Sequence, residues 1–308
     1  MHKGNYSVSI IGAGKVGTAM GLLLAKSGYS IKGVSCRTEP HAVAVARRLS
    51  ARAANGPAEA ASLGDLILVT TPDDAVARVV ADIAAAGGFS TGDVVFHMSG
   101  VLPVEVLEPA RKAGAEVGCI HPMQSFADVE GAIEQLQGSV FGVTAAGRAR
   151  VVALEVVEAV GGEAIDIEDR QKTLYHAAAC VVSNYLVTLA DYAEEIYRAI
   201  EVEPVAARRA YAPLIRGTAK NLLEKGPAEA LTGPIVRGDV ETVRAHLKKL
   251  TDSGIDTSVY RLLGARTVAL AQRRGALAHE TADKLLALLY GDEETSLSEP
   301  FSEELLPE

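Results

Sequence analysis

The chain has 308 residues, of which 48% are hydrophobic and 22% are charged, and it contains no Trp. This is about twice the length of a common single domain, and the composition excludes disordered and fibrous proteins. The formal net charge of -9 disfavours a nucleic-acid surface. The sequence contains no uninterrupted stretch of eighteen or more apolar residues, and its N-terminus lacks the layout of a signal peptide. We therefore expect a cytoplasmic protein with no membrane partner.

The first half of the chain alternates short apolar runs with amphipathic stretches. Helical segments, such as 15–27 and 40–49, lie between most of the apolar runs. This alternation predicts a parallel sheet covered on both faces, a Rossmann-type α/β domain over residues 1–168. The predicted strands lie within 6–14, 29–37, 65–72, 93–100, 115–122, 139–145 and 163–167.

The first predicted strand runs directly into a glycine motif at the start of a helix. Its three glycines have GxGxxG spacing, which provides a tight turn, close approach to a pyrophosphate and close packing of helix on strand. The helix N-terminus then faces the phosphates. We therefore expect a dinucleotide at this turn. The residues expected to form it are Gly12, Ala13, Gly14, Lys15, Val16 and Gly17.

The end of the second predicted strand indicates which dinucleotide binds. An NAD site commonly carries an acidic residue about 20 residues after the glycines, whereas an Arg accommodates the 2′-phosphate of NADP. Here Ser35, Arg37 and Thr38 place a guanidinium between hydroxyls, which favours NADP, with NADPH preferred over NADH. Glu39 follows closely and counts against this choice, and a solvated surface charge is the alternative interpretation of Arg37.

Two further strand ends are expected to line the same crevice, because ligands in open parallel sheets bind outside the carboxyl ends of strands. One begins at Thr70, where Thr71 and Pro72 would pass near the nicotinamide ribose. At the other, Ser99 and Gly100 would border the nicotinamide itself. Strand-to-helix turns use such residues for capping as well, so only their shared location favours a site.

The predicted strand at 115–122 ends with His121 and Pro122, which places an imidazole at the mouth of the crevice. Proline stiffens this turn. Gln124 and Ser125 add polar groups of the kind that orient a small carbonyl substrate. We expect His121 to orient or protonate the reacting group; the alternative is that it only closes the strand by hydrogen bonding.

After residue 168 the strands stop and helical periodicity takes over. Apolar residues repeat at three and four from Leu174 to Leu189, which predicts one buried stripe on a long helix. Beside it, His176, Ser183 and Asn184 fall within about a quarter turn and could donate together to a developing charge in a cleft. For Ser183, a bond between helices or at a subunit interface is an equal alternative.

A helical domain is predicted over residues 169–290, and residues 291–308 are acidic and predict a mobile tail. Before one helix, Thr232 and Arg237 offer a hydroxyl and a guanidinium suited to a substrate carboxylate, and Asp239 could cap the helix. A connection between two helices, with no role in binding, explains Gly233 and Pro234 equally well. The further predicted helices are 203–225, 239–253, 257–274 and 280–289.

The three cysteines, Cys36, Cys119 and Cys180, are too far apart in sequence to suggest a disulfide framework or a zinc site. They are interpreted as reduced thiols that act as small buried hydrophobes. No metal site is predicted.

Four motifs, SIIGAGKVG, HPMQSF, YHAAACVVSNYLV and LTGPIVRGD in this order, resemble bacterial Rossmann-like proteins that carry the domain of unknown function 2520. The likeness covers nearly the whole chain except the tail. More distantly, the chain is similar to pyrroline-5-carboxylate reductase, deazaflavin-dependent NADP reductase and the 6-phosphogluconate dehydrogenase superfamily. The resemblance implies a Rossmann domain that binds NADP, followed by an all-helical domain of the 6-phosphogluconate dehydrogenase C-terminal type. In these relatives the helical domain commonly forms a homodimer and completes the cleft.

The leading hypothesis is an NADP-dependent reductase that transfers hydride to a small carboxylated ketone or imine, with ketopantoate as one candidate from the resemblance. Related hydroxyacid dehydrogenases and ketopantoate reductases use a helix lysine as proton donor. Here Lys172 precedes the cleft-facing part of the long helix and Lys220 lies on a later one, so the expected donor is His121, His176 or Asn184. The alternatives are a dinucleotide-binding sensor without turnover and a deazaflavin-dependent NADP reductase.

Overall fold

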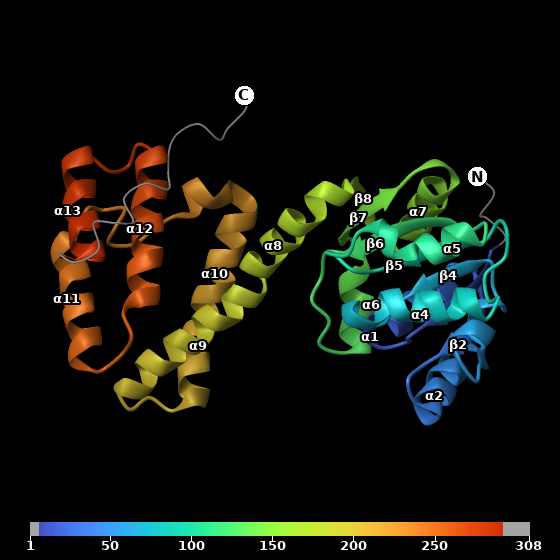
Figure 1. Ribbon diagram of the computed structural model, residues 1–308. Coiled ribbons are helices and arrows are strands. Elements are labelled where there is room, and N and C mark those ends of the chain that lie inside the picture. The colour runs from blue at the N-terminus through green and yellow to red at the C-terminus, as the bar shows by residue number, and fades with distance from the viewer. Residues whose placement is uncertain (1–5, 292–308) are drawn as a thin grey trace. The chain divides into compact units, whose positions relative to one another are not determined.

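The computed structural model describes residues 6–291 (Figure 1). The chain divides into two compact units, Met1–Leu186 and Val187–Glu308. The first unit holds a sheet and its flanking helices. The second consists of helices wherever its residues are described. Of the predicted tail 291–308, residues 292–308 lie outside the described part of the chain.

The first unit is built on one eight-stranded sheet in the order β3-β2-β1-β4-β5-β6-β7-β8. The seven predicted strands are confirmed, and the two-residue β3 is additional. The strands are parallel except that β7 runs antiparallel to β6, so the expectation of a wholly parallel sheet is wrong there. Apolar periodicity predicts a strand but not its direction. The strands are β1 (Ser7–Ile11), β2 (Ser30–Ser35), β3 (Arg52–Ala53), β4 (Leu66–Val69), β5 (Val94–His97), β6 (Glu116–Pro122), β7 (Val140–Ala145) and β8 (Glu163–Asp166).

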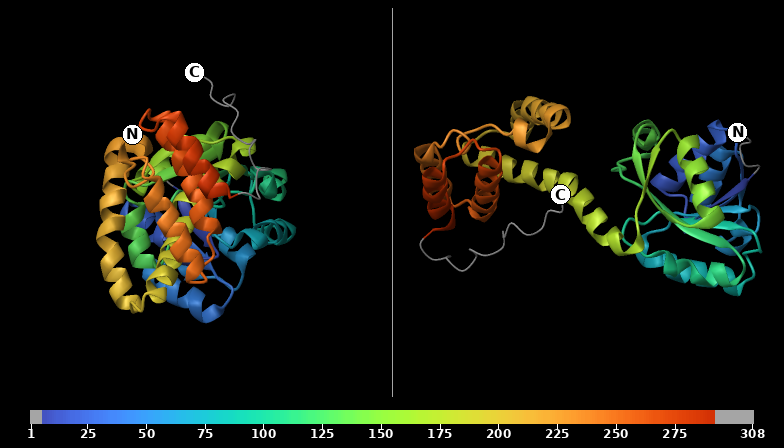
Figure 2. Two further views of the ribbon diagram at one scale, coloured as in Figure 1. Left: turned by 90° about the vertical axis from the view of Figure 1, so that its left-hand side faces the viewer. Right: turned by 90° about the horizontal axis from the view of Figure 1, so that it is seen from above.

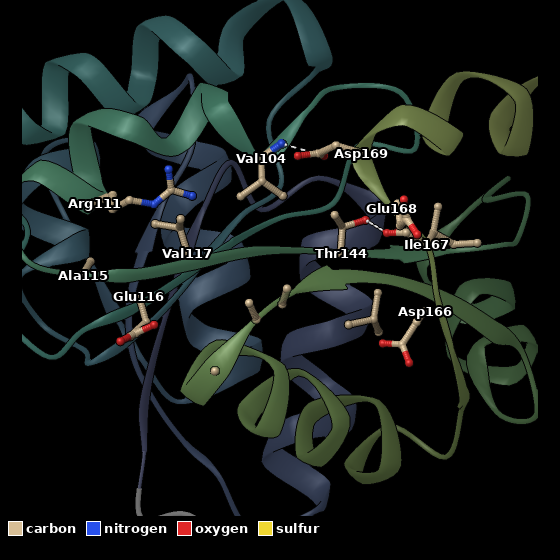
Figure 3. A pocket seen from close by; sticks show the side chains of 14 residues that line it. Val104, Arg111, Ala115, Glu116, Val117, Thr144, Asp166, Ile167, Glu168 and Asp169 are labelled. Carbon is tan, nitrogen blue, oxygen red and sulfur yellow. Dashed lines mark hydrogen bonds between the residues drawn. The ribbon is translucent and has the colours of Figure 1, made fainter.

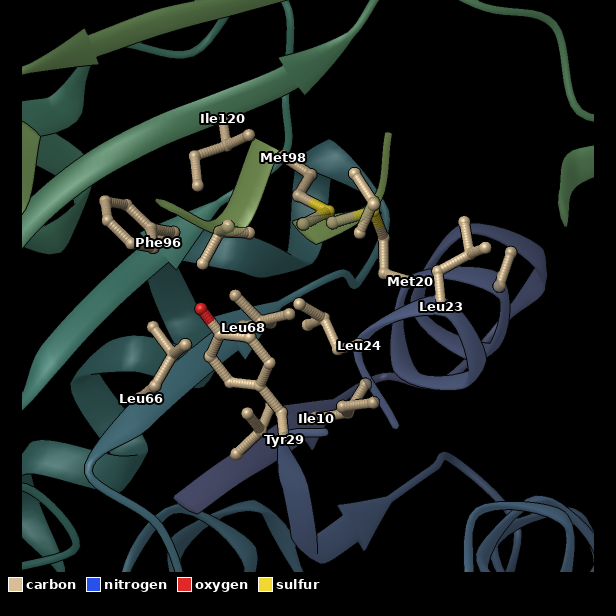
Figure 4. Close-up of a cluster of buried hydrophobic side chains, with 14 of the residues drawn as sticks. Ile10, Met20, Leu23, Leu24, Tyr29, Leu66, Leu68, Phe96, Met98 and Ile120 are labelled. Carbon is tan, nitrogen blue, oxygen red and sulfur yellow. The ribbon is translucent and has the colours of Figure 1, made fainter. Parts of the chain in front are cut away.

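Helices cover both faces of this sheet (Figure 2). Ile10, Leu68 and Phe96 pack on the face that carries α1 (Lys15–Lys26), α2 (Glu39–Leu49), α6 (Val129–Leu136) and α7 (Gly147–Ala159), and Figure 4 shows part of this core. Ile11 and Val95 pack on the opposite face, against α3 (Pro57–Ala61), α4 (Asp73–Ala85), η1 (Val104–Leu107) and α5 (Glu108–Lys112). The central strands β4 and β5 are buried at every residue because both faces of the sheet are covered there.

The order of the strands fixes where a ligand can bind. Chain order reverses between β1 and β4, and α/β sheets with this order hold ligands at that switch point, outside the carboxyl ends of the strands. The ends of β2, β4, β5 and β6 therefore face the same region as the glycine motif that follows β1.

The predicted helices are confirmed, but the long one is divided. Ser183, with φ -108° and ψ -69°, separates α8 (Lys172–Val182) from α9 (Asn184–Ala199). Strands end after β8 as predicted, whereas the two compact units divide after Leu186, because α8 packs with the sheet unit. The remaining helical elements are η2 (Asp169–Gln171), α10 (Pro204–Ala230, interrupted at Gly226), α11 (Val240–Asp252), α12 (Ser258–Arg273) and α13 (His279–Tyr290).

The expected burial of the apolar stripe on α8 and α9 is wrong for the single chain. The core of the second unit is formed by α11, α12 and α13, whereas α9 buries no residue and α10 buries only Ala207. Side chains along the stripe are exposed, including Leu174 at 78% and Val182 at 70%. By length and composition alone, one helical stretch among the described residues, Asp169–Ala199, could cross a membrane, with a mean hydropathy of 1.2.

Candidate functional site

A crevice of about 1010 Å³ opens where the strand order predicts it. It is formed by the glycine turn and by residues that follow β2, β4 and β6. Its volume suits a ligand larger than most drug-sized molecules. The sequence-predicted residues that line it are Gly12, Ala13, Gly14, Lys15, Val16, Ser35, Arg37, Thr70, Thr71, Pro72, His121 and Gln124.

The glycine turn has the geometry that a dinucleotide requires. Gly12 has φ +85°, and a Cβ there would lie 2.5 Å from Thr71 Cγ2 and 2.9 Å from Thr71 N, so any side chain would be strained and crowded. The Ser35 carbonyl accepts hydrogen bonds from Gly12 N and Ala13 N at 2.8 and 3.3 Å, which ties the turn to the end of β2. Gly17 packs against Thr70 rather than lining the crevice.

The first turn of α1 can receive an anion. Gly14 is its N-cap residue, and no side chain caps the helix. The N–H groups at a helix start that lack a cap are typical phosphate donors, favoured further by the helix dipole. The glycine turn and the start of α1 therefore fit the pyrophosphate of a dinucleotide.

Charged side chains of both signs line the crevice, with Asp73 and Asp74 beside the basic residues. Arg37 is exposed and lines the crevice, whereas Glu39 begins α2 and is not among the lining residues. Arg78 of α4 and His41 of α2 also line it, and sequence reasoning missed both because neither belongs to a recognisable motif. His41 Nε2 lies 3.0 Å from the Ala13 carbonyl and so links α2 to the glycine turn. The predicted cofactor residue Thr38 is the N-cap of α2 and does not line the crevice.

Two imidazoles meet over Gly100 at the end of β5. The rings of His121 on β6 and His176 on α8 have centroids 5.9 Å apart. A Cβ added to Gly100 would lie 2.6 Å from His176 Cδ2 and 2.8 Å from His121 Nε2. The structure thus brings together three residues that sequence reasoning placed on three separate elements.

Tyr175 of α8, which sequence reasoning missed, orients His121. Its hydroxyl lies 3.4 Å from His121 Nδ1, and the two rings pack edge to face. Burial raises the pKa of Tyr175, so it remains a phenol that can donate to Nδ1. Burial, followed by the neighbouring His176 and Lys172, lowers the pKa of His121 to about 4, so its ring is neutral at pH 7. With Nδ1 as acceptor, the hydrogen is on Nε2, which lies on the side of the ring that faces Gly100.

Several predicted substrate residues are engaged elsewhere or lie apart from this cluster. Gln124 Nε2 donates to Ser139 Oγ at 3.3 Å, and Gln124 Oε1 accepts from Ser125 N at 2.9 Å. Ser183 and Asn184 are exposed and lie about two helical turns beyond His176. Neither they nor Ser125 line the crevice.

The predicted carboxylate-binding segment belongs to the second unit. Thr232 and Arg237 are both exposed there, between α10 and α11. Asp239 caps α11 as predicted, because its side chain accepts from Thr242 N at 3.0 Å. All three cysteines are free, with Cys119 buried and the other two partly buried. Within residues 6–291, no group of three or more His, Cys, Asp or Glu side chains is placed to hold a metal ion.

A second hollow, of about 750 Å³, lies beside β6, β7, α5 and the segment after β8 (Figure 3). Most of its charged groups already have partners. Arg111 pairs with Glu108, Asp169 accepts from Val104 N, and Asp166 pairs with Arg150. The crevice at the glycine turn, with the uncapped start of α1 and the neighbouring rings of His121 and His176, is therefore the better candidate site.

Comparison with known proteins agrees with this assignment. Residues 1–122 match the Rossmann-like domain, and residues 139–267 match the domain of unknown function (DUF2520). No curated protein gives a significant sequence match.

Among solved structures, protein TM1727 from Thermotoga maritima is 25% identical, covers 86% of this chain and 99% of its own, and has a TM-score of 0.70. Protein BF3122 from Bacteroides fragilis, a candidate NADP oxidoreductase, is 24% identical over 87% of this chain and 99% of its own, with a TM-score of 0.68.

A reductive aminase from Aspergillus terreus, in complex with NADPH and ethyl levulinate, is 19% identical over 91% of this chain and 98% of its own, with a TM-score of 0.59. At these identities, the similarity to NAD(P)-dependent reductases shows a shared fold. The chain therefore combines a Rossmann-like domain with the domain of unknown function 2520, as its four motifs predicted.

Proposed function

We propose that the protein is an NADP-dependent reductase that transfers hydride to the carbonyl or imine carbon of a small carboxylated compound. The observation that carries the proposal is the meeting of His121 and His176 over Gly100, where His121 also lines the crevice that begins at the glycine turn. A protein that only sensed the dinucleotide would have no need of two imidazoles at that point.

The dinucleotide, when bound, supplies the hydride, and the chain supplies the environment for the charge that develops. His121 is neutral and donates from Nε2 to the oxygen or nitrogen of the reacting group, which stabilises that charge without first losing a proton. His176, half-buried beside it, is placed to supply the proton that completes the reduction. Tyr175 holds the His121 ring in the required tautomer.

A ketone or an imine fits this arrangement, and the reductive aminase with the same fold favours an imine or a ketone–amine pair. Ketopantoate is one carboxylated candidate. Arg237 stays the proposed partner of the carboxylate and Thr232 its neighbour. Ser183 and Asn184 stay proposed contacts with substrate.

The first test is titration with NADPH and NADH, followed by NADPH oxidation with ketopantoate, pyrroline-5-carboxylate and other small keto acids and cyclic imines. We expect tight NADPH binding, turnover of at least one compound, and a loss of about 100-fold in kcat/KM for His121→Ala with NADPH binding kept. Binding without turnover across this panel would instead favour a sensor. Reduction of a deazaflavin alone would favour a deazaflavin reductase.

Arg37 is proposed to select NADPH. Replacing it with Asp removes the cation and adds a charge that repels the 2′-phosphate, so Arg37→Asp should weaken NADPH binding by about 100-fold and NADH binding by less than about threefold. Arg78→Ala tests another cation that lines the crevice and should give a smaller loss. Equal losses for both dinucleotides in Arg37→Asp would contradict the selector role.

We also propose a cytoplasmic homodimer formed through the helical domain. Support comes from α9 and α10, which bury almost nothing in the single chain, and from their exposed apolar side chains, including Val187 at 70% and Leu223 at 86%. Soluble proteins rarely leave large apolar surfaces in water, so these side chains favour a partner that covers them. A second copy of the chain is the partner that the resemblance implies.

Light scattering coupled to gel filtration should give twice the chain mass. Val187→Asp places a charge on both copies at a two-fold interface and should shift the protein to a monomer at micromolar concentration. Val151→Asp, at an exposed site (55%) on α7 of the sheet unit, is the matched control and should leave the dimer intact. A wild-type monomer, or one that sediments with lipid vesicles, would contradict the proposal.

A further inference from the structure

A buried lysine lies beneath the cluster of imidazoles. Lys172, the first residue of α8, is only 2% exposed. Its Nζ donates to the Ser99 carbonyl at 3.0 Å and contacts Cys119 Sγ at 2.8 Å. It forms no ion pair with a carboxylate anywhere in residues 6–291. Burying an ammonium without a counter-ion is unfavourable, so the fold is expected to keep it for what it does to its partners.

The Lys172 ammonium contacts the loop of residues 99–102, and most polar backbone and side-chain atoms of Ser99 in this loop form hydrogen bonds. Ser99 N donates to His97 Nδ1 at 3.1 Å, and Ser99 Oγ accepts from Val101 N and Leu102 N at 3.2 and 3.0 Å. The Ser99 hydroxyl oxygen therefore stabilises the turn, and the predicted contacts of Ser99 with cofactor and substrate stay a prediction. The Ser99 carbonyl accepts from Lys172 and also from Cys119 Sγ, at 3.2 Å.

One peptide group of this loop remains unused. Among the N–H groups of residues 99–102, only that of Gly100 donates to no group within the described chain. Because the Ser99–Gly100 peptide is trans, its N–H points opposite to its carbonyl and so away from Lys172. An ammonium on the carbonyl oxygen polarises the peptide and makes its N–H a stronger donor.

We propose that Lys172 is a positioning residue that orients and polarises the Ser99–Gly100 peptide, so that the Gly100 N–H binds a carbonyl oxygen beside His121 and His176. The inference rests on the proposed reductase function. The carbonyl oxygen has two possible sources, the carboxamide of the nicotinamide ring and the reacting group of the substrate. Both are sp² oxygen acceptors that a polarised backbone donor would hold in the same way.

The direct test is the ¹⁵N–¹H resonance of the Gly100 amide in the full-length protein without ligand. Lys172→Met keeps the length of the side chain and removes the charge, and it should move the Gly100 ¹⁵N resonance upfield. Cys119→Ala, the matched control, removes the weaker thiol donor to the same carbonyl but keeps the hydrogen bond from Lys172, so it should shift the resonance much less than Lys172→Met does. If Lys172→Met does not fold, Lys172→Gln, which keeps a neutral donor, should give a smaller shift in the same direction.

The NADPH affinity and the kcat/KM of Lys172→Met then show whether the carbonyl oxygen belongs to the nicotinamide or to the substrate. If the nicotinamide carboxamide is the ligand, Lys172→Met should weaken NADPH binding about tenfold, the loss of roughly one hydrogen bond. The same variant should leave binding of 2′-phospho-ADP-ribose, which lacks the nicotinamide, unchanged. If the substrate is the ligand, NADPH binding stays intact and kcat/KM falls about tenfold.

Two outcomes would overturn the inference. One is a folded Lys172→Met protein whose Gly100 resonance matches that of the wild type. The other is an equal loss of affinity for NADPH and 2′-phospho-ADP-ribose, since this would show that Lys172 only supports the fold. Failure of the wild-type protein to bind NADPH would reject the reductase proposal by itself, and the Gly100 resonance would still decide the role of Lys172.

Discussion

Gly100→Ala is expected to lower kcat/KM by about 100-fold or more while leaving the protein folded. The new methyl group would lie within 2.8 Å of both His121 Nε2 and His176 Cδ2, closer than carbon contacts allow, so both rings must move. A displacement of about 1 Å in groups that orient a reacting centre costs roughly this factor. The backbone at Gly100 is not left-handed, so Ala meets crowding there and not backbone strain.

The readouts are steady-state kinetics with the substrate found in the panel, NADPH affinity and the thermal midpoint. Overpacking of this kind lowers stability by about 1–3 kcal/mol, so the variant should remain folded. Gly56→Ala is the matched control, since a Cβ at Gly56 meets nothing within 4 Å, and it should retain full activity. A Gly100→Ala protein with wild-type kinetics would show that the two imidazoles do not act at this point.

Much of the fold could be predicted from the sequence because its signals are local. Continuous apolar strands predicted burial on both faces, and the GxGxxG turn predicted Gly12 in a conformation that other residues avoid. The direction of β7 could not be predicted, because an apolar run reads the same in either direction. The exposure of the α8–α9 stripe could not be predicted either, since periodicity indicates a face that must be covered but not which chain covers it.

Some residues of the candidate site could likewise be predicted from the sequence, and others could not. His121 could be placed at the crevice because parallel strands deliver their ends to one edge of a sheet. Its contact with His176 depends on how α8 packs, and its partner Tyr175 is a helix aromatic that reads as ordinary core. Lys172 was set aside because it precedes the cleft-facing part of the helix. Its effect is indirect, through the Ser99 carbonyl, and no spacing in the sequence reveals it.

Acid should destabilise the sheet unit well before its carboxylates titrate. Burial, followed by the charge of Lys172, lowers the pKa of His97 from 6.5 to about 3, and burial lowers that of His121 to about 4. Below pH 6.5 the two histidines bind protons in the unfolded chain but stay neutral in the folded chain. The free energy of unfolding therefore falls as the pH falls. Each histidine contributes up to about 1.4 kcal/mol per pH unit, down to its folded pKa.

Between pH 7.5 and 5, the two histidines together should therefore remove roughly 4 kcal/mol, a large part of the stability of a typical domain. His97→Asn keeps an acceptor for Ser99 N and removes the titrating ring, so the slope of unfolding free energy against pH should be about halved. His121→Asn should halve it as well, and the double variant should be nearly flat over this range. Amide hydrogen exchange of β5 and β6 measures this unit without the helical domain. An unchanged slope in His97→Asn would mean that the ring takes up its proton in the folded protein, and that burial does not hold its pKa low.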